Sequence, residues 1–286
     1  MHALLELEFC NYLLEKKERK TLDMSEVVNQ HVTDTAVILS QGEIATGIYS
    51  MWIETSTAKN AKAGQFISLY SSNGATLLPR PISICEINEE RTALRLVYRV
   101  VGKGTKEFSA LNKNDTIKVL GPLGNGYTLK NQTAILAAGG IGIPPIVELA
   151  KQLHHQFDCK LNIVVGYRND ELFLVDELKQ YGEVFISTED GSVGTKGNIL
   201  DAIRENNIEA DIIYACGPMP MLRAVKGFAL SQDIEAQISL EERMACGIGA
   251  CLGCVCKTKN KDEHTHVNNT RICTDGPVFE ARMVEI

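Results

Sequence analysis

The sequence predicts an antiparallel β-barrel, then a doubly wound parallel α/β domain, then a small cysteine-rich tail. Three observations predict this order. Short β-like runs, punctuated by Gly, Asn and Asp, fill residues 29 to about 127. From about 131, apolar strands alternate with helical segments. Four cysteines then fall within eleven positions, 246–256. We expect domains at 29–128, 129–240 and 241–286, preceded by an N-terminal extension, 1–28.

Composition excludes several classes of function. The 286 residues are 44% hydrophobic and 23% charged, which is close to the globular average and argues against disorder. A net charge of −7, with no long basic run, argues against nucleic acid as a partner. No apolar stretch is long enough to span a membrane. The N-terminus has its apolar residues before its basic ones, the reverse of a signal peptide, so we expect a cytoplasmic protein.

The N-terminal extension and the isolated cysteines carry no function in this interpretation. Residues 1–28 have leucines at helical spacing, and Met24 is an alternative start. In a reducing compartment, clustered cysteines bind metal or do redox chemistry more often than they form disulfides. Cys10, Cys85 and Cys159 stand alone, so we interpret each as a small hydrophobic residue.

The stretch 29–128 predicts the barrel. Its apolar and polar residues alternate in short runs, which is typical of half-buried strands. The runs are HVTDTAVILSQ, GIYSMWIET, GQFISLYSS, ALRLVYRVVG and DTIKVLGPLG. We expect one helix in this part, over 104–111.

The stretch 129–240 predicts a parallel sheet with helices between its strands. Expected strands are TAILAAGG, KLNIVVGYR, EVFISTEDG and ADIIYACGP. Expected helices are IPPIVELAKQLHHQ, DELFLVDELKQYG, GNILDAIREN and MPMLRAVKGFALS.

The tail predicts an iron–sulfur centre. Its spacing is C-x4-C-x2-C with a fourth cysteine after eighteen intervening residues, which is the plant-type [2Fe–2S] pattern; the four are Cys246, Cys251, Cys254 and Cys273. The intervening glycines let backbone N–H groups approach the sulfides. A zinc knuckle is the alternative, although zinc sites usually have two separate C-x2-C pairs. Cys256 could replace Cys254, but the spacing favours Cys254. His264 and His266 are interpreted as solvated, not as Rieske-type ligands.

Two motifs in the barrel predict a flavin site. In LLPRPISI, Arg80 offers a forked cation for pyrophosphate, Pro81 fixes a turn and Ser83 can reach the polar edge of an isoalloxazine ring. In LVYRVVGKGT, a glycine turn ending in Gly104 and Thr105 presents backbone donors where a helix begins. Tyr98 lies on the strand before this turn. Its alternative interpretation is an aromatic residue of the barrel face.

Two turns in the α/β part predict a nicotinamide site. Gly139, Gly140 and Gly142 join a strand to a helix and would bring pyrophosphate to the helix N-terminus, although G-x-G-x-x-G itself is absent. No acid ends the second strand, so the choice between NAD and NADP stays open. Cys216 and Gly217 end a later strand, where open α/β sheets bind ligands. A buried, inert thiol is the alternative for Cys216.

These motifs resemble a known family. R-P-x-S, G-x-G-T, GGIG-x-PP and CGPMPML are similar to the motifs of the ferredoxin–NADP reductase superfamily. The tail, MACGIGACLGC with ICTDGPVF, resembles the electron-transfer subunit of class 1B dihydroorotate dehydrogenase. The resemblance covers about 30–286. The N-terminal extension and the longer gap before Cys273 depart from it.

The two turns of the α/β part would bind NAD through Gly139, Gly140, Gly142, Cys216 and Gly217. The resemblance implies two further cofactors. FAD would be bound by Arg80, Pro81, Ile82, Ser83, Val97, Tyr98, Arg99, Gly104 and Thr105. The resemblance implies that a [2Fe–2S] cluster is ligated by Cys246, Cys251, Cys254 and Cys273. It also implies a second polypeptide, an FMN-containing catalytic subunit that oxidises dihydroorotate in pyrimidine biosynthesis, in a heterotetramer of two copies of each chain.

We therefore expect electrons to pass from the partner's FMN through the cluster and FAD to NAD⁺. No catalytic side chain is expected, because the cofactors supply the chemistry and no nucleophile motif is present. One alternative keeps the cofactors in an NADH-dependent ferredoxin:NADP reductase or a sulfide dehydrogenase. Another is a non-redox module with structural zinc and an empty barrel.

Overall fold

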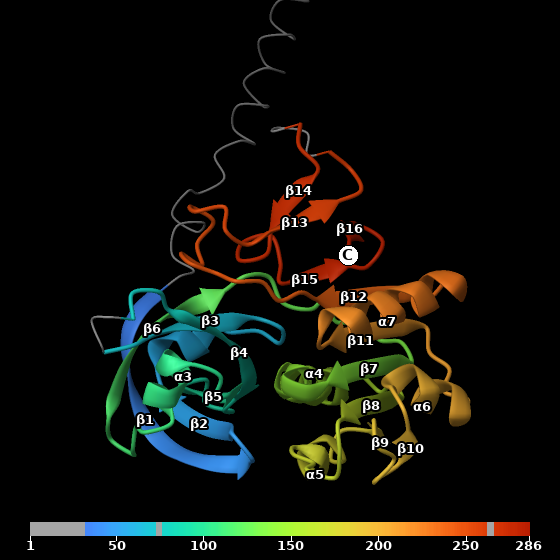
Figure 1. Cartoon of the computed structure of the whole chain (residues 1–286), viewed down its shortest axis with the longest axis horizontal. Coiled ribbons are helices and arrows are strands. Elements are labelled where there is room, and N and C mark those ends of the chain that lie inside the picture. The colour runs from blue at the N-terminus through green and yellow to red at the C-terminus, as the bar shows by residue number, and fades with distance from the viewer. Residues whose placement is uncertain (1–31, 73–75, 262–265) are drawn as a thin grey trace, which may run out of the picture.

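The computed structural model describes residues 32–72, 76–261 and 266–286. The N-terminal extension, with Cys10 and Met24, and His264 lie outside these residues. The fold class is as predicted: an antiparallel barrel, a parallel sheet with helices, and a cysteine-rich tail (Figure 1).

The barrel closes in the order β1-β2-β5-β4-β3-β6. Its strands are β1 (Val32–Ala45), β2 (Ile48–Glu54), β3 (Phe66–Tyr70), β4 (Arg80–Ile87), β5 (Ala93–Arg99) and β6 (Thr116–Leu123). Apolar residues such as Ile38, Met51 and Leu94 are fully buried in its core. A short helix, α3 (Lys103–Phe108), follows β5 and ends sooner than the predicted 104–111.

The parallel sheet has the order β10-β9-β8-β7-β11-β12, and β15 joins it in the antiparallel direction. Its strands are β7 (Ala134–Gly139), β8 (Leu161–Tyr167), β9 (Glu183–Thr188), β10 (Thr195–Lys196), β11 (Ile212–Cys216), β12 (Glu235–Ser239) and β15 (Val278–Glu280). The helices between them are α4 (Pro144–Gln156), α5 (Val175–Leu178), α6 (Ile199–Glu205) and α7 (Met219–Ser231).

Three elements of this domain differ from prediction. The helix expected over DELFLVDELKQYG is only the four residues of α5, because Leu174 before it adopts φ 62°, outside the helical region. Strands β10 and β12 are additional, and β12 forms the edge to which the tail attaches.

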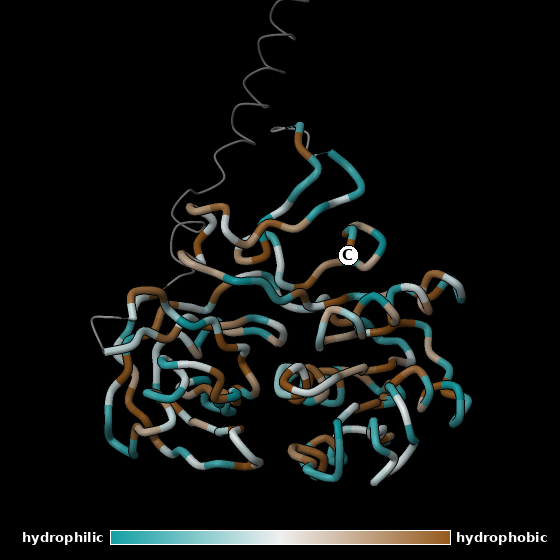
Figure 2. The backbone as a smooth tube through the Cα atoms, in the orientation of Figure 1, coloured by the Kyte–Doolittle hydropathy of each residue, from teal (hydrophilic) through white to brown (hydrophobic). Residues whose placement is uncertain are grey.

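The tail is only partly separate from the parallel sheet. Strands β13 (Val255–Thr258), β14 (Asn269–Arg271) and β16 (Val284–Glu285) pair with one another, whereas β15 pairs with β12. In Figure 2, apolar colour runs along the central strands, and much of the β13–β14 hairpin is hydrophilic. Across the described ranges, no helix combines the length and apolarity that a membrane crossing requires.

An apolar seam joins the barrel to the α/β domain. Cys85 and Val97, on the outer face of the barrel, pack in one cluster with Ile143 and Ile146 of the segment that enters α4. This buried seam confirms that Cys85 is a small hydrophobic residue. Burial raises the pKa of its thiol far above the ordinary value.

Candidate cofactor sites

Arg80 and Gly104 form a cradle at one end of β4. A Cβ placed on Gly104 would lie 3.0 Å from Nε of Arg80, so the arginine rests directly over the glycine. The Nη1 atom of Arg80 donates to the carbonyl of Leu78 at 2.6 Å. The forked cation therefore faces the helical turn of α3, an arrangement that fits the pyrophosphate of a dinucleotide.

Thr105 organises that turn instead of projecting from it. Its Oγ1 accepts from the backbone N–H of Val101 at 3.0 Å and of Gly102 at 3.2 Å. The side chain is buried. The hydroxyl that sequence reasoning offered to a phosphate is thus already used to shape the loop.

Pro81, Ile82 and Ser83 follow Arg80 along β4 and are half-buried. They pair in register with Ser68, Ile67 and Phe66 of β3. Because strand residues alternate between faces, Pro81 and Ser83 share the face opposite Ile82, which packs against the barrel core. Pro81 and Ser83 therefore keep exposed surface that a flat ring could contact.

The three predicted residues of β5 lie on its two faces: Tyr98 points into the barrel, whereas Val97 and Arg99 point toward the α/β domain. Tyr98 is 2% exposed, and its hydroxyl donates to Gln41 at 3.0 Å inside the barrel. Its side chain is therefore a barrel aromatic, which was the alternative interpretation. Val97 packs in the interdomain seam. Arg99 reaches the α/β domain, where its Nη2 lies 4.0 Å from the Cβ position of Gly140.

The predicted nicotinamide residues come together in space. A Cβ on Gly142 would lie 2.4 Å from the carbonyl oxygen of Cys216 and 2.6 Å from Cα of Gly217. The glycine turn and the end of β11 are thus in direct contact, at the carboxyl edge of the sheet where such folds bind ligands. Gly139 is also close to a neighbour, because its Cβ would meet Sδ of Met221 at 2.7 Å.

Cys216 is partly exposed at the end of β11. Desolvation raises the pKa of its thiol to about 12, and a hydrogen bond with Ser239 opposes that rise. The thiol therefore stays protonated near neutral pH, which suits a packing role better than a nucleophilic one.

An acid lies beside the end of β8, although not on it. Strand β9 pairs with β8, and the backbone N–H of Glu189 donates to the carbonyl of Tyr167 at 3.1 Å. Asp190 is bonded similarly to Arg168 at 3.3 Å. Sequence reasoning looked for this acid at the end of the second strand only.

The predicted cluster ligands are gathered in one loop and one turn. Backbone N–H groups point at their sulfurs: Gly249 to Cys273 at 3.2 Å, and Cys251 to Cys246 at 3.4 Å. Cys254 and Cys273 are buried, whereas Cys251 is exposed. Such N–H donors offset the negative charge of an iron–sulfur cluster, so the donor set fits one.

The thiols differ in acidity. Burial opposes ionisation of Cys246, but N–H groups of Ile248, Cys251 and Ala250 outweigh it and lower the pKa to about 6. Burial and the neighbouring Cys254 raise the pKa of Cys273 to about 12. Within the described ranges, no group of three or more His, Cys, Asp or Glu is arranged to hold a single metal ion.

The structure also describes two alternative ligands. Cys256 is on β13, opposite Thr270, and packs partly buried against the core. His266 is exposed and adopts φ 56°.

Two residues that sequence reasoning missed hold the Cys273 turn. Asp275 accepts hydrogen bonds from the hydroxyl of Thr270 at 2.8 Å and the backbone N–H of Arg271 at 2.9 Å. Asn125, just beyond β6, donates from Nδ2 to the carbonyl of Thr274 at 3.0 Å. The Asp-Gly pair after Cys273 is a turn signal that could have identified Asp275.

The cysteine loop rests on the barrel. A Cβ on Gly247 would lie 3.2 Å from Oγ of Ser68 and 3.2 Å from Cδ1 of Leu123. Ser68 pairs with Pro81 of the Arg80–Ser83 segment. The barrel face with the flavin motif therefore lies between the cysteine loop, through β3, and the glycine turn, through Arg99 of β5.

Comparison with protein families gives two matches. The iron-sulfur cluster binding domain of dihydroorotate dehydrogenase B matches residues 241–285. The oxidoreductase NAD-binding domain matches residues 136–227.

Curated relatives match along nearly their whole length. The "Dihydroorotate dehydrogenase B (NAD(+)), electron transfer subunit" of Fusobacterium nucleatum is 46% identical over 255 residues, covering 85% of this chain and 95% of the relative. The protein of the same description from Listeria innocua is 41% identical over 254 residues, covering 87% and 97%.

Solved structures share the fold. An NADH-dependent reduced ferredoxin-NADP oxidoreductase, described for flavin-based electron bifurcation, aligns with TM-score 0.78 and 28% identity, covering 87% of this chain and 89% of that one. A ferredoxin NADP+ reductase from Neisseria gonorrhoeae, with bound FAD and NADP, aligns with TM-score 0.60 and 18% identity, covering 75% and 94%.

Proposed function

Because the chain belongs to the family of electron transfer subunits of dihydroorotate dehydrogenase B, we propose that it connects a dihydroorotate-oxidising partner to NAD⁺. In this role it is an oxidoreductase subunit of pyrimidine biosynthesis. It holds FAD, an iron–sulfur cluster of the [2Fe–2S] type and, transiently, NAD⁺.

One observation carries the proposal: the flavin motif lies between the other two candidate sites. Gly247 of the cysteine loop touches Ser68 on one side, and Arg99 approaches Gly140 on the other. FAD, when bound, exchanges electrons in pairs with nicotinamide and singly with iron–sulfur centres. A middle position for the flavin motif is what such an exchange requires.

Each cofactor is assigned to residues with separate tasks. We assign FAD to residues 29–128, where Arg80 would pair with pyrophosphate and the half-buried Ser83 would face the ring. We assign NAD⁺ to residues 129–240, where Gly142 contacts the backbone of Cys216. Without a side chain at Gly142, the backbone of this turn could approach the dinucleotide closely. We assign the cluster to residues 241–286, with Cys246, Cys251, Cys254 and Cys273 as its ligands.

The partner would be an FMN-containing catalytic subunit, in a heterotetramer of two copies of each chain. Membership of a family of electron transfer subunits implies a catalytic partner subunit. That this partner contains FMN, and that the complex has two copies of each chain, is our proposal. Ile248 and Leu252 support a docking face at the cysteine loop, because they are 50% and 62% exposed beside the exposed Cys251. Large apolar side chains exposed together mark interaction surfaces.

The test is copurification followed by an assay. The chain is coexpressed with the dihydroorotate-oxidising subunit of the same operon or genome, purified anaerobically, and mixed with dihydroorotate and NAD⁺. We expect NADH to form only when both chains are present. A complex that binds dihydroorotate but forms no NADH would contradict the proposal.

A second function has one observation in its favour, the fold match to the NADH-dependent reduced ferredoxin-NADP oxidoreductase. The same copurification separates the two. A partner containing [4Fe–4S] clusters, with no dihydroorotate oxidation, would favour this second function.

A further inference from the structure

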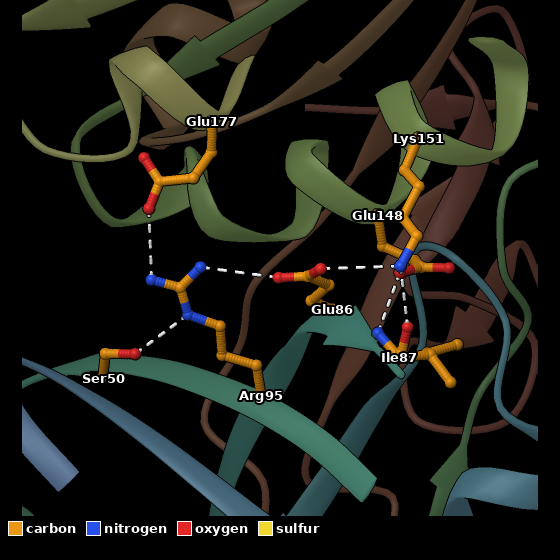
Figure 3. A network of polar contacts seen from close by, with 7 residues as sticks. All are labelled: Ser50, Glu86, Ile87, Arg95, Glu148, Lys151 and Glu177. Atoms are coloured by element: carbon orange, nitrogen blue, oxygen red, sulfur yellow. Dashed lines mark hydrogen bonds and ion pairs between the residues drawn. The ribbon is translucent and has the colours of Figure 1, made fainter. Parts of the chain in front are cut away.

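Beyond the apolar seam, the barrel and the α/β domain are joined by a polar clasp. The seam lies where α4 begins, with Ile143 and Ile146 against the barrel. The clasp lies further along the same helix, where Glu148 and Lys151 face the end of β4 (Figure 3).

The clasp grips both backbone groups of a single barrel residue. Glu148 Oε2 accepts from the N–H of Ile87 at 2.8 Å. Lys151 Nζ donates to the carbonyl of Ile87 at 3.0 Å. The hydrogen-bonded pairing between β3 and β4 ends at Ser83. Near the end of β4, the side chains of Glu148 and Lys151 bond the backbone of Ile87 in place of a neighbouring strand.

The carboxylate of Glu148 is committed to this geometry. The residue is 3% exposed, and its Oε1 accepts from Nε2 of Gln152 at 2.7 Å. A buried carboxylate is costly unless it is hydrogen-bonded. A shift of the barrel relative to α4 would remove the Ile87 bond and leave that oxygen without its partner.

Charged side chains extend the clasp across the interface. Glu86 lies 3.5 Å from Lys151 and 3.5 Å from Arg95. Arg95 continues to Glu177 of α5 at 3.3 Å and to Ser50 of β2 at 2.9 Å. Figure 3 shows this chain of contacts running between the barrel strands and the two helices.

Side chains do not fill all of the space beside the clasp. A cavity of about 500 Å³ opens beside it, lined by Ile87, Glu148 and Lys151 together with Lys62, Arg91 and Tyr127. Directional hydrogen bonds therefore act together with the apolar seam in fixing the relative placement of β4 and α4.

We propose that Glu148 and Lys151 are positioning residues for hydride transfer, acting through their clasp on Ile87. Helix α4 carries the predicted nicotinamide turn, Gly140–Gly142, at its start, and β4 carries the predicted flavin segment. Tying Ile87 to the helix fixes the distance between those two segments. This inference rests on the proposed function, since it needs NAD and flavin at these places.

The test compares Glu148→Leu with Glu148→Gln in the full-length, FAD-containing chain. Leucine fills the space without accepting a hydrogen bond, whereas the glutamine amide oxygen can still accept from Ile87. Anaerobic stopped-flow measures flavin reduction by NADH. For the leucine variant we expect the limiting rate to fall roughly 10- to 100-fold, because small misplacements are costly in hydride transfer. The Kd for NADH should change less than about threefold, and glutamine should restore the rate.

A second readout needs no cofactor turnover. Hydrogen–deuterium exchange of the peptide containing Ile87, measured on the flavin-free chain, should be faster in Glu148→Leu and unchanged in Glu148→Gln. The control variant is Lys160→Met, which removes an exposed ion pair with Glu183 inside the α/β domain. It should alter neither readout. If Glu148→Leu fails to fold, Lys151→Met replaces it, with the same expected fall in rate.

The outcomes separate this inference from the proposed function. If NADH reduces the wild-type flavin and Glu148→Leu does so equally fast despite faster exchange at Ile87, the positioning role is wrong. It is also wrong if glutamine fails to restore the rate. If NADH does not reduce the wild-type flavin at all, the proposed function fails, while the exchange data still report the clasp.

Discussion

Gly247 of the cysteine loop lies against Ser68 of strand β3, so close that a Cβ on the glycine would stand 3.2 Å from the serine hydroxyl. Gly247 also adopts φ 71°, in the left-handed region. Both facts make this residue one of the points at which the tail is seated on the barrel, in addition to Asn125.

Gly247→Ala should loosen that seat. We expect the added methyl to push the loop from β3 and to slow electron exchange between flavin and cluster, seen by rapid-freeze EPR after NADH addition. Gly47→Ala is the matched control, because Gly47 has φ 69° but open space around it. Both variants should lose roughly 1 kcal/mol of stability through backbone strain. Equal electron-transfer rates in the two variants would refute the seating role.

Gly104→Ala should weaken FAD binding. Its methyl would lie 3.0 Å from Nε of Arg80, so the arginine must leave its place over the turn. We expect at least a tenfold rise in the Kd for FAD, measured by fluorescence quenching, on the order of 1.4 kcal/mol. Gly102→Ala in the same turn has no atom within 4 Å and should retain flavin. If both variants lose flavin equally, displacement of Arg80 is not the cause of the weaker FAD binding.

Cys273→Ser should remove the cluster, and Cys256→Ser should not. Cys273 is buried and accepts the Gly249 N–H, whereas Cys256 lies on β13 with its own packing. Iron and acid-labile sulfide content of anaerobically purified protein measures the difference. The expected result is near-complete loss for Cys273→Ser and wild-type content for Cys256→Ser. Loss in the Cys256 variant alone would reverse the ligand assignment.

Glu148 should give stability a pH dependence. Burial raises the pKa of its carboxyl, against the hydrogen bonds of Gln152 and Ile87 and the charge of Lys151. The pKa of this carboxyl is near 4.3 in the unfolded state and higher in the folded state, so Glu148 contributes stability at pH values below the unfolded-state pKa. That contribution is lost as pH rises through the folded-state pKa. The free energy of unfolding of Glu148→Gln, relative to wild type, should therefore increase as pH rises above about 4. Urea denaturation at several pH values measures it, and a difference that falls with pH would contradict the assignment.

Local patterns sufficed for much of this fold. The alternating runs of the barrel and the strand–helix order of the α/β domain are short-range signals, so both domains were predictable. The thiol spacing was equally local. The short α5 was not, because nothing in the propensity of Leu174, a buried core residue, signals its left-handed conformation.

Contacts between domains could not be predicted from the sequence. Strand alternation in LVYRVVG puts Tyr98 and Arg99 on opposite faces of β5, but it does not predict that Arg99 reaches Gly140. The clasp of Glu148 on Ile87 joins residues 61 positions apart. Such pairings depend on how two finished domains pack.

Anaerobic EPR of the purified full-length chain after addition of NADH alone is the most direct test of the central claim, that nicotinamide, flavin and cluster sites form one continuous path. We predict a rhombic signal from a reduced binuclear iron site, approaching the intensity obtained with dithionite. Flavin bleaching without that signal, or no such signal even with dithionite, would contradict the account.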